Sequence, residues 1–383
     1  MKILLGTHHL EQRAGSELFT AELAKSLKAR GNDVAAFTFF KGGITDQIEA
    51  AGIPVFDADQ VNALTHFAPD VVQTCHSPCA HFLRAVLPDA VRVHAMLGVL
   101  PPLEAPPLGG DSYALGLAVS EEVLDRIKTT AFGRDVETAL FRNWYDDAAV
   151  TVSLGPPSSH RPLRVAVVSN HAAPDLIRAL AALEAAGDVK AEYIGAPHKS
   201  VLVDGQLLVS YDLIISIGRT ALLAAACGVP CIMADIHGSD GLLTAENLNR
   251  VRKVNFSGRL HRHPVTASHL QEQIAQITSY DRAGLRSCMV AEYSLNSRTT
   301  WLLSRYDQLA AARRSGVWSP APLDAPGEGI VHAEIVGTVR GLRGRVSQLE
   351  RELDAAKREI AGSKRPGIGQ RLVRQWKSAK SSR

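Results

Sequence analysis

Residues 212–235 read DLIISIGRTALLAAACGVPCIMAD: an apolar run, a Gly-Arg-Thr turn, a series of small residues and a second apolar run. Both apolar runs are short enough for buried parallel strands, and the small residues between them predict a helix that starts near Thr220. The unpaired amides of its first turn would point beyond the end of the preceding strand. Gly218 permits close approach of a ligand, and Arg219 supplies a positive fork for a phosphate. The turn is therefore either a phosphate site or an ordinary tight turn with a solvated arginine.

Strand and helix patterns alternate in the same way along the rest of the body. Apolar runs at residues 2–7, 33–40 and 53–56 flank a helical pattern, and a second series starts with LRVAVVSN at residues 163–170, after a Pro/Ser-rich segment. Such alternation predicts parallel sheets covered by helices on both faces. We therefore expect an α/β fold with two Rossmann-like, doubly wound domains that face each other across a cleft.

The end of the chain has a different pattern. Eight apolar residues advance by alternating steps of four and three, which is typical of a coiled coil: Ile335, Val339, Leu342, Val346, Leu349, Leu353, Ala356 and Ile360. The register permits a dimer or a trimer, while Gly337, Gly341 and Gly344 weaken its first half. The expected boundaries are a first domain at 1–150, a second at 160–297, a last helix at 298–315, a Pro/Gly-rich linker at 316–330, the coiled coil at 331–362 and a basic amphipathic tail at 363–383.

Composition narrows the class of protein. The 383 residues are 46% hydrophobic and 21% charged, and no apolar run reaches the ~18 residues of a spanning helix. The first residues are too quickly polar for a secretory signal. Five cysteines are an odd and sparse set that suits a reduced cytoplasm. We expect a cytoplasmic protein without disulfides, and the spacing of Cys75, His76, Cys79 and His81 fits no standard zinc site.

Charge is distributed unevenly. Residues 331–383 hold 13 Lys/Arg and 5 Asp/Glu, a net charge of +8, whereas the rest of the chain has a net charge of −5. An acidic body argues against binding to nucleic acid. The basic tail is either a solvated terminus or a peripheral contact with an anionic membrane surface, such as the inner face of the cell membrane.

The motifs of the second half resemble the donor-binding region of retaining GT-B glycosyltransferases, particularly family 4. Gly218 falls on the glycine of the family's Glu-x-Phe-Gly turn, and residues 224–230 on the latter half of its Glu-Ala-Met-Ala-x-Gly-x-Pro helix. HGSDGLLTAEN at residues 237–247 and NFSGR at 255–259 resemble the signatures of one branch of that family. AGSE at residues 14–17 lies where the family keeps a glycine loop, and the likeness covers about residues 1–310.

The resemblance implies a nucleotide-diphosphate sugar as donor and a glycan or lipid-linked acceptor, as in polysaccharide biosynthesis. It places the acceptor on the first domain and the donor on the second. It also implies retention of the anomeric configuration and no metal or other cofactor, because helix N-termini and basic side chains would neutralise the leaving diphosphate. The candidate catalytic residues are His76, Glu246 and Asp240. The candidate donor-binding residues are Gly15, Ser169, Asn170, Gly218, Arg219, Thr220 and Gly241.

Two positions depart from the family pattern. Its two glutamates, eight residues apart, fall on Ile215 and Leu223, and neither side chain can accept a hydrogen bond. An alternative hypothesis is therefore a catalytically impaired pseudo-glycosyltransferase that acts as a scaffold or partner protein. A nucleotide-sugar epimerase of the same fold is a weaker alternative, since acidic residues are scarce around the expected cleft.

Overall fold

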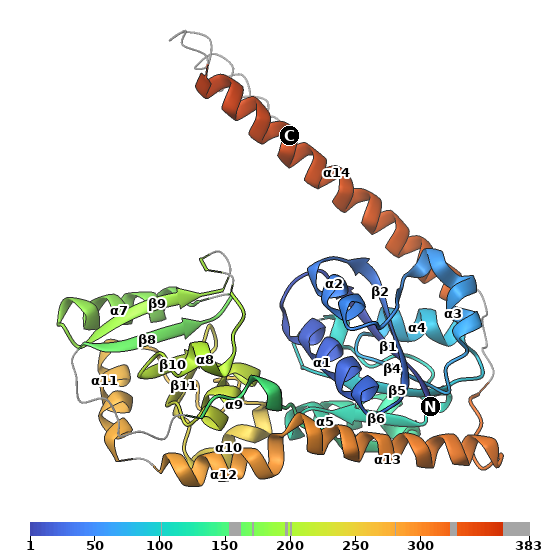
Figure 1. Ribbon diagram of the computed structural model, residues 1–383, viewed down its shortest axis with the longest axis horizontal. Coiled ribbons are helices and arrows are strands. Elements are labelled where there is room, and N and C mark those ends of the chain that lie inside the picture. Colours follow the sequence, from blue (N-terminus) through green and yellow to red (C-terminus); the bar gives the residue numbers. More distant parts are fainter. Residues whose placement is uncertain are drawn as a thin grey trace. The chain divides into compact units, whose positions relative to one another are not determined.

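The computed structural model describes residues 1–100, 102–152, 162–170, 172–195, 198–199, 201–279, 281–321 and 328–362 (Figure 1). The chain divides into two units, residues 1–329 and 330–383. The first unit contains two sheets, and the second contains one long helix. The predicted basic tail at 363–383 lies outside the described residues, as does part of the predicted linker.

The first sheet has seven parallel strands in the order β3-β2-β1-β4-β5-β6-β7. Its central strands are buried almost throughout because helices lie on both faces. The strands are β1 (Lys2–Leu10), β2 (Asp33–Lys41), β3 (Val55–Phe56), β4 (Val71–Thr74), β5 (Val91–Met96), β6 (Leu115–Ala118) and β7 (Thr138–Leu140). The helices are α1 (Gly15–Ala29), α2 (Gly43–Ala50), α3 (Val61–Phe67), α4 (Ser77–Val86), α5 (Glu121–Lys128) and α6 (Ala131–Asp135).

The second sheet has five strands in the order β12-β11-β10-β8-β9, and only the pairing of β11 with β12 is antiparallel. The strands are β8 (Leu163–Val168), β9 (Val189–Ile194), β10 (Leu213–Ser216), β11 (Cys231–Asp235) and β12 (Gly238–Leu242). The helices are α7 (Pro174–Ala185), α8 (Gly205–Leu208), α9 (Gly218–Cys227), α10 (Ala245–Val251), α11 (Ala267–Ala275) and α12 (Arg282–Tyr293). The two sheets confirm the predicted α/β class.

Short 3₁₀ turns complete the first unit: η1 (Ala58–Gln60), η2 (Pro102–Glu104), η3 (Gly110–Ser112), η4 (Asp147–Ala149), η5 (Arg252–Val254) and η6 (Gln276–Thr278). Two details differ from the sequence interpretation. Helix α9 begins at Gly218 rather than near Thr220, because Gly218 takes a positive φ of 56° that turns the chain directly out of the strand. The HGSDG segment forms β12, whose composition lacks the alternating apolar pattern of a strand.

The last helix of the first unit, α13 (Leu295–Arg314), follows the second domain in sequence but packs against the first sheet (Figure 1). Leu302 and Tyr306 are fully buried in the core of the first domain. The Tyr306 hydroxyl donates a hydrogen bond to Gln73 Oε1 on β4 at 2.6 Å. This helix therefore joins the second domain to the first by a second connection.

Helix α14 (Glu328–Gly362) runs for 35 residues and spans the heptad pattern of the sequence. Among the residues that the structure describes, no helix combines the length and the apolar character needed to cross a bilayer.

Candidate functional site

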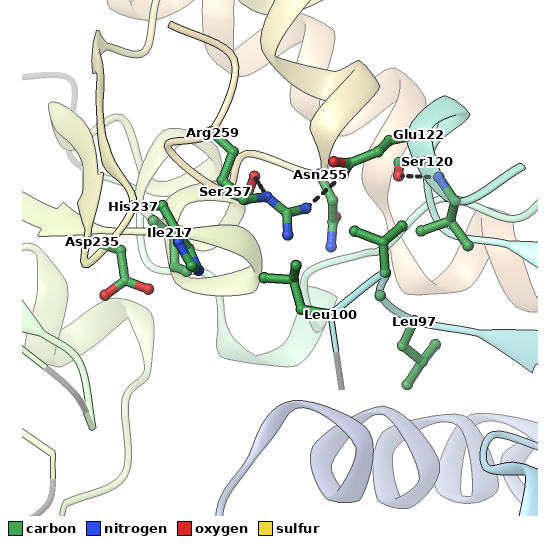
Figure 2. Close-up of a pocket in the computed structure, with 13 residues that line it drawn as sticks. Leu97, Leu100, Ser120, Glu122, Ile217, Asp235, His237, Asn255, Ser257 and Arg259 are labelled. Carbon is green, nitrogen blue, oxygen red and sulfur yellow. Dashed lines mark hydrogen bonds and ion pairs between the residues drawn. The ribbon is translucent and has the colours of Figure 1, made fainter. Parts of the chain in front are cut away.

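A pocket of about 210 Å³ lies between the two sheets of the first unit, where the loops of both domains meet (Figure 2). Its wall from the first domain is the loop after β5, residues 97–100, and the start of α5. Its wall from the second domain is Ile217 after β10, the β11–β12 turn and residues 255–259. Loops at the carboxyl ends of parallel strands are where open α/β sheets bind ligands. The volume falls below the ~300 Å³ of a typical whole-ligand site, so the pocket has room for only part of a drug-sized ligand.

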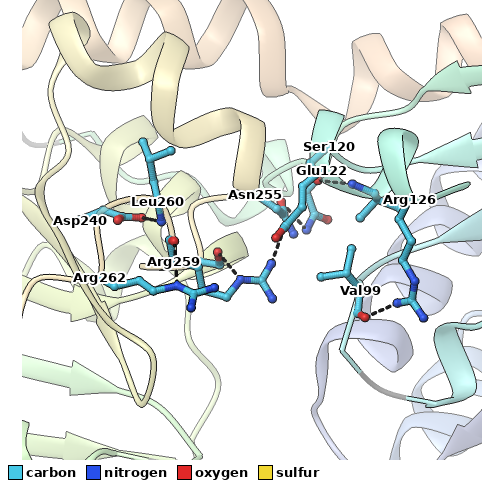
Figure 3. Close-up of polar contacts among 12 residues, drawn as sticks. Val99, Ser120, Glu122, Arg126, Asp240, Asn255, Arg259, Leu260 and Arg262 are labelled. Carbon is cyan, nitrogen blue, oxygen red and sulfur yellow. Dashed lines mark hydrogen bonds and ion pairs between the residues drawn. The ribbon is translucent and has the colours of Figure 1, made fainter. Parts of the chain in front are cut away.

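Arg259 is the positive group of this pocket. Its Nε donates to Ser257 Oγ at 3.0 Å, and its Nη2 forms an ion pair of 2.5 Å with Glu122 Oε2 in the first turn of α5 (Figures 2 and 3). Only 11% of the Arg259 side chain is exposed, so the surrounding protein fixes the direction of the guanidinium. The ion pair joins the two domains across the pocket.

The backbone of residues 255–258 is held in an unusual conformation. Asn255 and Phe256 both have φ of 56°, and Gly258 has φ of 73°. A positive φ is costly for a bulky residue such as phenylalanine. This conformation persists because the Phe256 ring is buried, with its centre 5.6 Å from the centre of the Tyr293 ring. In addition, Phe256 O accepts a hydrogen bond from Gly218 N at 3.0 Å. This geometry turns Asn255, Ser257 and Arg259 toward the pocket (Figure 2).

Arg219, in the first turn of α9, reaches across to the first domain. Its Nη2 donates to Glu22 Oε2 on α1, and its guanidinium lies 5.6 Å from the ring centre of Trp144. Trp144 Nε1 donates to the same carboxylate oxygen at 2.9 Å. Within the described residues, Arg219 Nη1 is buried and has no hydrogen-bond partner. The guanidinium thus bridges the domains and keeps one donor unused.

The first turns of α1 and α9 both lack a side-chain cap, since Ala14 and Ile217 occupy their N-cap positions. In α9 the first amide, Gly218 N, donates to Phe256 O, so only the amides that follow it in the first turn could bind an anion. A Cβ added to Gly15 would meet no atom within 4 Å, so this glycine borders open space.

His76 follows β4 and is buried at the start of α4. Its Nδ1 accepts a hydrogen bond from His8 N at 3.0 Å, which places the proton of the neutral ring on Nε2. Nε2 lies 3.8 Å from Glu104 Oε1. Burial, together with a smaller effect of the neighbouring His9 and His8, lowers the pKa of His76 to about 3. The contact is therefore that of a neutral N–H with a carboxyl group, rather than an ion pair.

Glu104 ends η2 and is itself buried. Burial raises the pKa of its carboxyl to about 7, against the opposing effect of hydrogen bonds from the backbone of Leu97 and Gly98. The bond from Leu97 N to Glu104 Oε2 measures 2.9 Å. Because Leu97 and Gly98 line the pocket, Glu104 connects His76 to the wall from the first domain.

No protein-family model matches the sequence, and no curated protein matches it. Solved structures do resemble the fold. The structure of an Anabaena protein, Alr3699/HepE, in complex with UDP and glucose superposes with a TM-score of 0.58 at 16% identity, over 80% of this chain and 100% of that one. A glycosyltransferase from Rickettsia africae ESF-5 gives 0.55 at 14% identity, over 80% and 98%. The lipopolysaccharide outer core galactosyltransferase WaaB gives 0.51 at 12% identity, over 82% and 99%.

The chain has the GT-B fold. The two Rossmann-like domains and the cleft between them, which the sequence predicted, are thereby confirmed. In this GT-B body, the cleft contains the pocket that Arg259 and Glu122 border.

None of the predicted site residues lines this pocket, although Gly218 and Arg219 directly follow Ile217, which does. Asp240 is buried, and its carboxylate accepts hydrogen bonds from Leu260 N at 3.2 Å and His261 N at 2.7 Å (Figure 3). It therefore holds the loop that follows NFSGR. Glu246 is exposed in the first turn of α10.

The remaining predicted positions lie around the second sheet. A Cβ on Gly241 would stand 2.6 Å from Gln273 Oε1, and its φ is 79°, so packing within the domain explains this glycine. Ser169 and Asn170 follow β8, with Asn170 exposed, and Thr220 is half-buried in the first turn of α9.

Sequence reasoning missed Glu104, Glu122 and Glu22, which contact His76, Arg259 and Arg219 respectively. Glu104 carried a signal that could have been used, because it is a lone acid in the apolar, proline-rich segment PPLEAPP. Glu22 and Glu122 lie on ordinary amphipathic helices, and nothing in the sequence distinguishes them from solvated charges.

Proposed function

We propose that the protein is a glycosyltransferase that binds a nucleotide-diphosphate sugar in the interdomain pocket and transfers the sugar to a glycan or lipid-linked acceptor. The observation that carries the proposal is the pocket itself, which both GT-B domains line at the carboxyl ends of their strands around a fixed arginine. The Anabaena structure of the same fold contains UDP and glucose, so uridine nucleotides are the first donors to test.

The second domain supplies the groups for a diphosphate. Arg259 provides a guanidinium in the pocket, and Arg219 provides an unused Nη1 at the uncapped start of α9. These donors favour a reaction in which the protein rather than a metal ion neutralises the leaving group. In a retaining reaction the bond from the anomeric carbon to the diphosphate oxygen breaks, the bond to the acceptor oxygen forms, and the acceptor proton passes to the leaving diphosphate.

The first domain supplies groups for sugar hydroxyls. His76 Nε2–H is a hydrogen-bond donor of fixed direction, because the backbone of His8 occupies Nδ1. Glu104 Oε1 lies 3.8 Å from His76 Nε2 and is an acceptor for a hydroxyl, while Oε2 accepts a hydrogen bond from Leu97 N and so holds the loop at residues 97–100. We assign His76 to orienting a hydroxyl rather than to removing its proton, since its free nitrogen already carries one.

Calorimetric titration with UDP, GDP, CDP and dTDP, in the presence of a metal chelator, tests the proposal. One nucleotide is expected to bind saturably. Arg259→Met should weaken that binding roughly 10- to 100-fold, as expected for a lost charged hydrogen bond. Arg250→Met, on the exposed face of α10, is the matched control and should leave the affinity unchanged.

The alternative is a scaffold protein that keeps the fold without activity. It is favoured by Ile215 and Leu223, which occupy the glutamate positions and are packed into two different hydrophobic clusters of the second domain. Absence of binding by all four nucleotides, with a folded protein, would favour this alternative and contradict the transferase.

We further propose a cytoplasmic enzyme held at the inner face of the membrane by residues 363–383, which contain seven Lys/Arg and no Asp/Glu. Deletion of residues 363–383 should abolish binding to anionic vesicles at low salt and leave nucleotide affinity unchanged. Equal vesicle binding by the full chain and the deletion variant would refute the membrane contact.

A further inference from the structure

Helix α14 presents an apolar stripe to solvent. Five large side chains of this helix are between 40% and 63% exposed: Val339, Leu342, Val346, Leu349 and Leu353. They recur at steps of three and four residues and therefore share one face of the helix. Burial of apolar surface is favourable, so an exposed stripe of this kind marks an interaction surface.

We propose that this stripe pairs with α14 of a second copy of the chain, in a parallel, in-register, two-stranded coiled coil. The uninterrupted heptad spacing over a continuous 35-residue helix supports a helical partner (Figure 1). Because both partners would carry the same stripe at the same spacing, the knobs of one helix match the holes of the other.

The residue types at the core positions favour the parallel dimer. Three of the four a positions are β-branched, whereas only one d position is, and two d positions are leucine. The a positions are Val339, Val346, Leu353 and Ile360, and the d positions are Ile335, Leu342, Leu349 and Ala356. β-Branched residues at a with leucine at d favour two parallel strands, because only in parallel pairs do a residues pack against a and d against d.

The flanking charges are compatible with this pairing. In a parallel dimer each g position faces the e position of the next heptad in the partner. Arg345 then faces Glu350, and Glu352 faces Lys357, so both charged g–e pairs are attractive. Antiparallel pairing that aligns Val339 with Ala356 of the partner would also bring Arg345 next to an acid, Glu352. The asymmetry between a and d, rather than the charges, therefore selects the orientation.

The glycines of the helix do not interrupt the row of a and d residues. Gly337 and Gly344 fall at f positions and Gly341 at a c position, all on the outer face. A Cβ added to Gly341 or Gly344 would meet no atom within 4 Å. These residues weaken the helix, yet they leave every core layer filled by a side chain.

Cysteine cross-linking of the full-length chain tests both the partner and its orientation. Ala356→Cys is at a d position and Ala355→Cys, its neighbour, at an outer c position, and both alanines are exposed. Each variant is made with Cys288→Ser, because Cys288 is the one native cysteine that is not buried. Under mild oxidation Ala356→Cys should form a disulfide-linked dimer at least roughly tenfold faster than Ala355→Cys, since only the d position brings the two Cβ atoms within bonding range.

Light scattering on the unmodified chain completes the test. A mass of twice the 41.1 kDa chain mass, lost when residues 331–383 are deleted, is the expected result. A monomer, or equal cross-linking at both positions, would overturn the proposal. So would cross-linking only in a mixture of Val339→Cys and Ala356→Cys chains, because that pair meets in the antiparallel arrangement. The proposal does not depend on nucleotide binding, so the result of these experiments is independent of the test of the transferase assignment.

Discussion

The two walls of the pocket are built in different ways. The wall from the second domain combines a costly backbone conformation at residues 255–258 with the fixed guanidinium of Arg259. The wall from the first domain is an apolar loop held from behind by a buried carboxyl group and a neutral imidazole. The second wall therefore carries the guanidinium of Arg259 and the carboxylate of Asp235, and the first wall carries Glu122 beside an apolar loop. The positive group of one wall is thus paired with the acid of the other.

The largest effect should come from Phe256, which the fold keeps at positive φ by burial. Phe256→Ala should lower the free energy of unfolding by about 3–5 kcal/mol. Phe256→Gly should cost less than Phe256→Ala, by about 1 kcal/mol, because glycine accepts positive φ without penalty. Denaturant unfolding of both variants measures the difference.

Phe132 provides the matched control in the first domain. It is buried in helix α6, where backbone φ is negative, so Phe132→Gly should be less stable than Phe132→Ala. If Phe256→Gly were also less stable than Phe256→Ala, the positive φ at Phe256 would carry no measurable cost in free energy.

A second effect concerns Glu104 and changes with pH. Its carboxyl pKa is raised from 4.5 to about 7 in the folded chain, so the folded state binds more protons than the unfolded state between these values. The free energy of unfolding should therefore fall as pH rises from 4.5 to 7, by about 3 kcal/mol from this group. Glu104→Gln cannot titrate and should remove that part of the pH dependence.

Denaturant unfolding of Glu104→Gln at a series of pH values checks this expectation. Glu49→Gln, at an exposed position of α2, is the control and should follow the unmodified protein. Parallel pH curves for Glu104→Gln and the unmodified chain would show that the carboxyl group of the first wall is solvated rather than buried.

The smallest effect should come from the ion pair between Glu122 and Arg259, which joins the two walls. Glu122 competes with a diphosphate for Arg259, so Glu122→Gln should strengthen nucleotide binding about three- to tenfold while changing stability by less than ~1 kcal/mol. Glu121→Gln is the neighbouring control, since Glu121 pairs with Arg142 of its own domain. Weaker binding by Glu122→Gln in calorimetry would instead make the carboxylate part of the ligand site.

The sequence by itself determined the α/β class, because short apolar runs alternating with helical patterns can be buried only as covered sheets. The turn at Gly218 was also predictable, since a strand, a glycine and a small-residue helix follow one another locally. The antiparallel β12 was not predictable, because its residues pair with β11 through tertiary contacts rather than through an apolar pattern of their own.

The NFSGR motif at residues 255–259 does border the pocket, but only the tertiary structure decided which charged residues pair across it. Glu122 meets Arg259 across 137 positions of sequence, and Glu22 meets Arg219 across 197. Motif reasoning named Asp240, which accepts a hydrogen bond from Leu260 N, and Gly241, where a side chain would collide with Gln273, so packing within the second domain explains both positions. The local pattern of apolar and polar residues in the sequence predicts which side chains are buried. The pairing of charges across the two domains depends on which distant segments of the chain the tertiary structure brings together. No local sequence pattern predicts that.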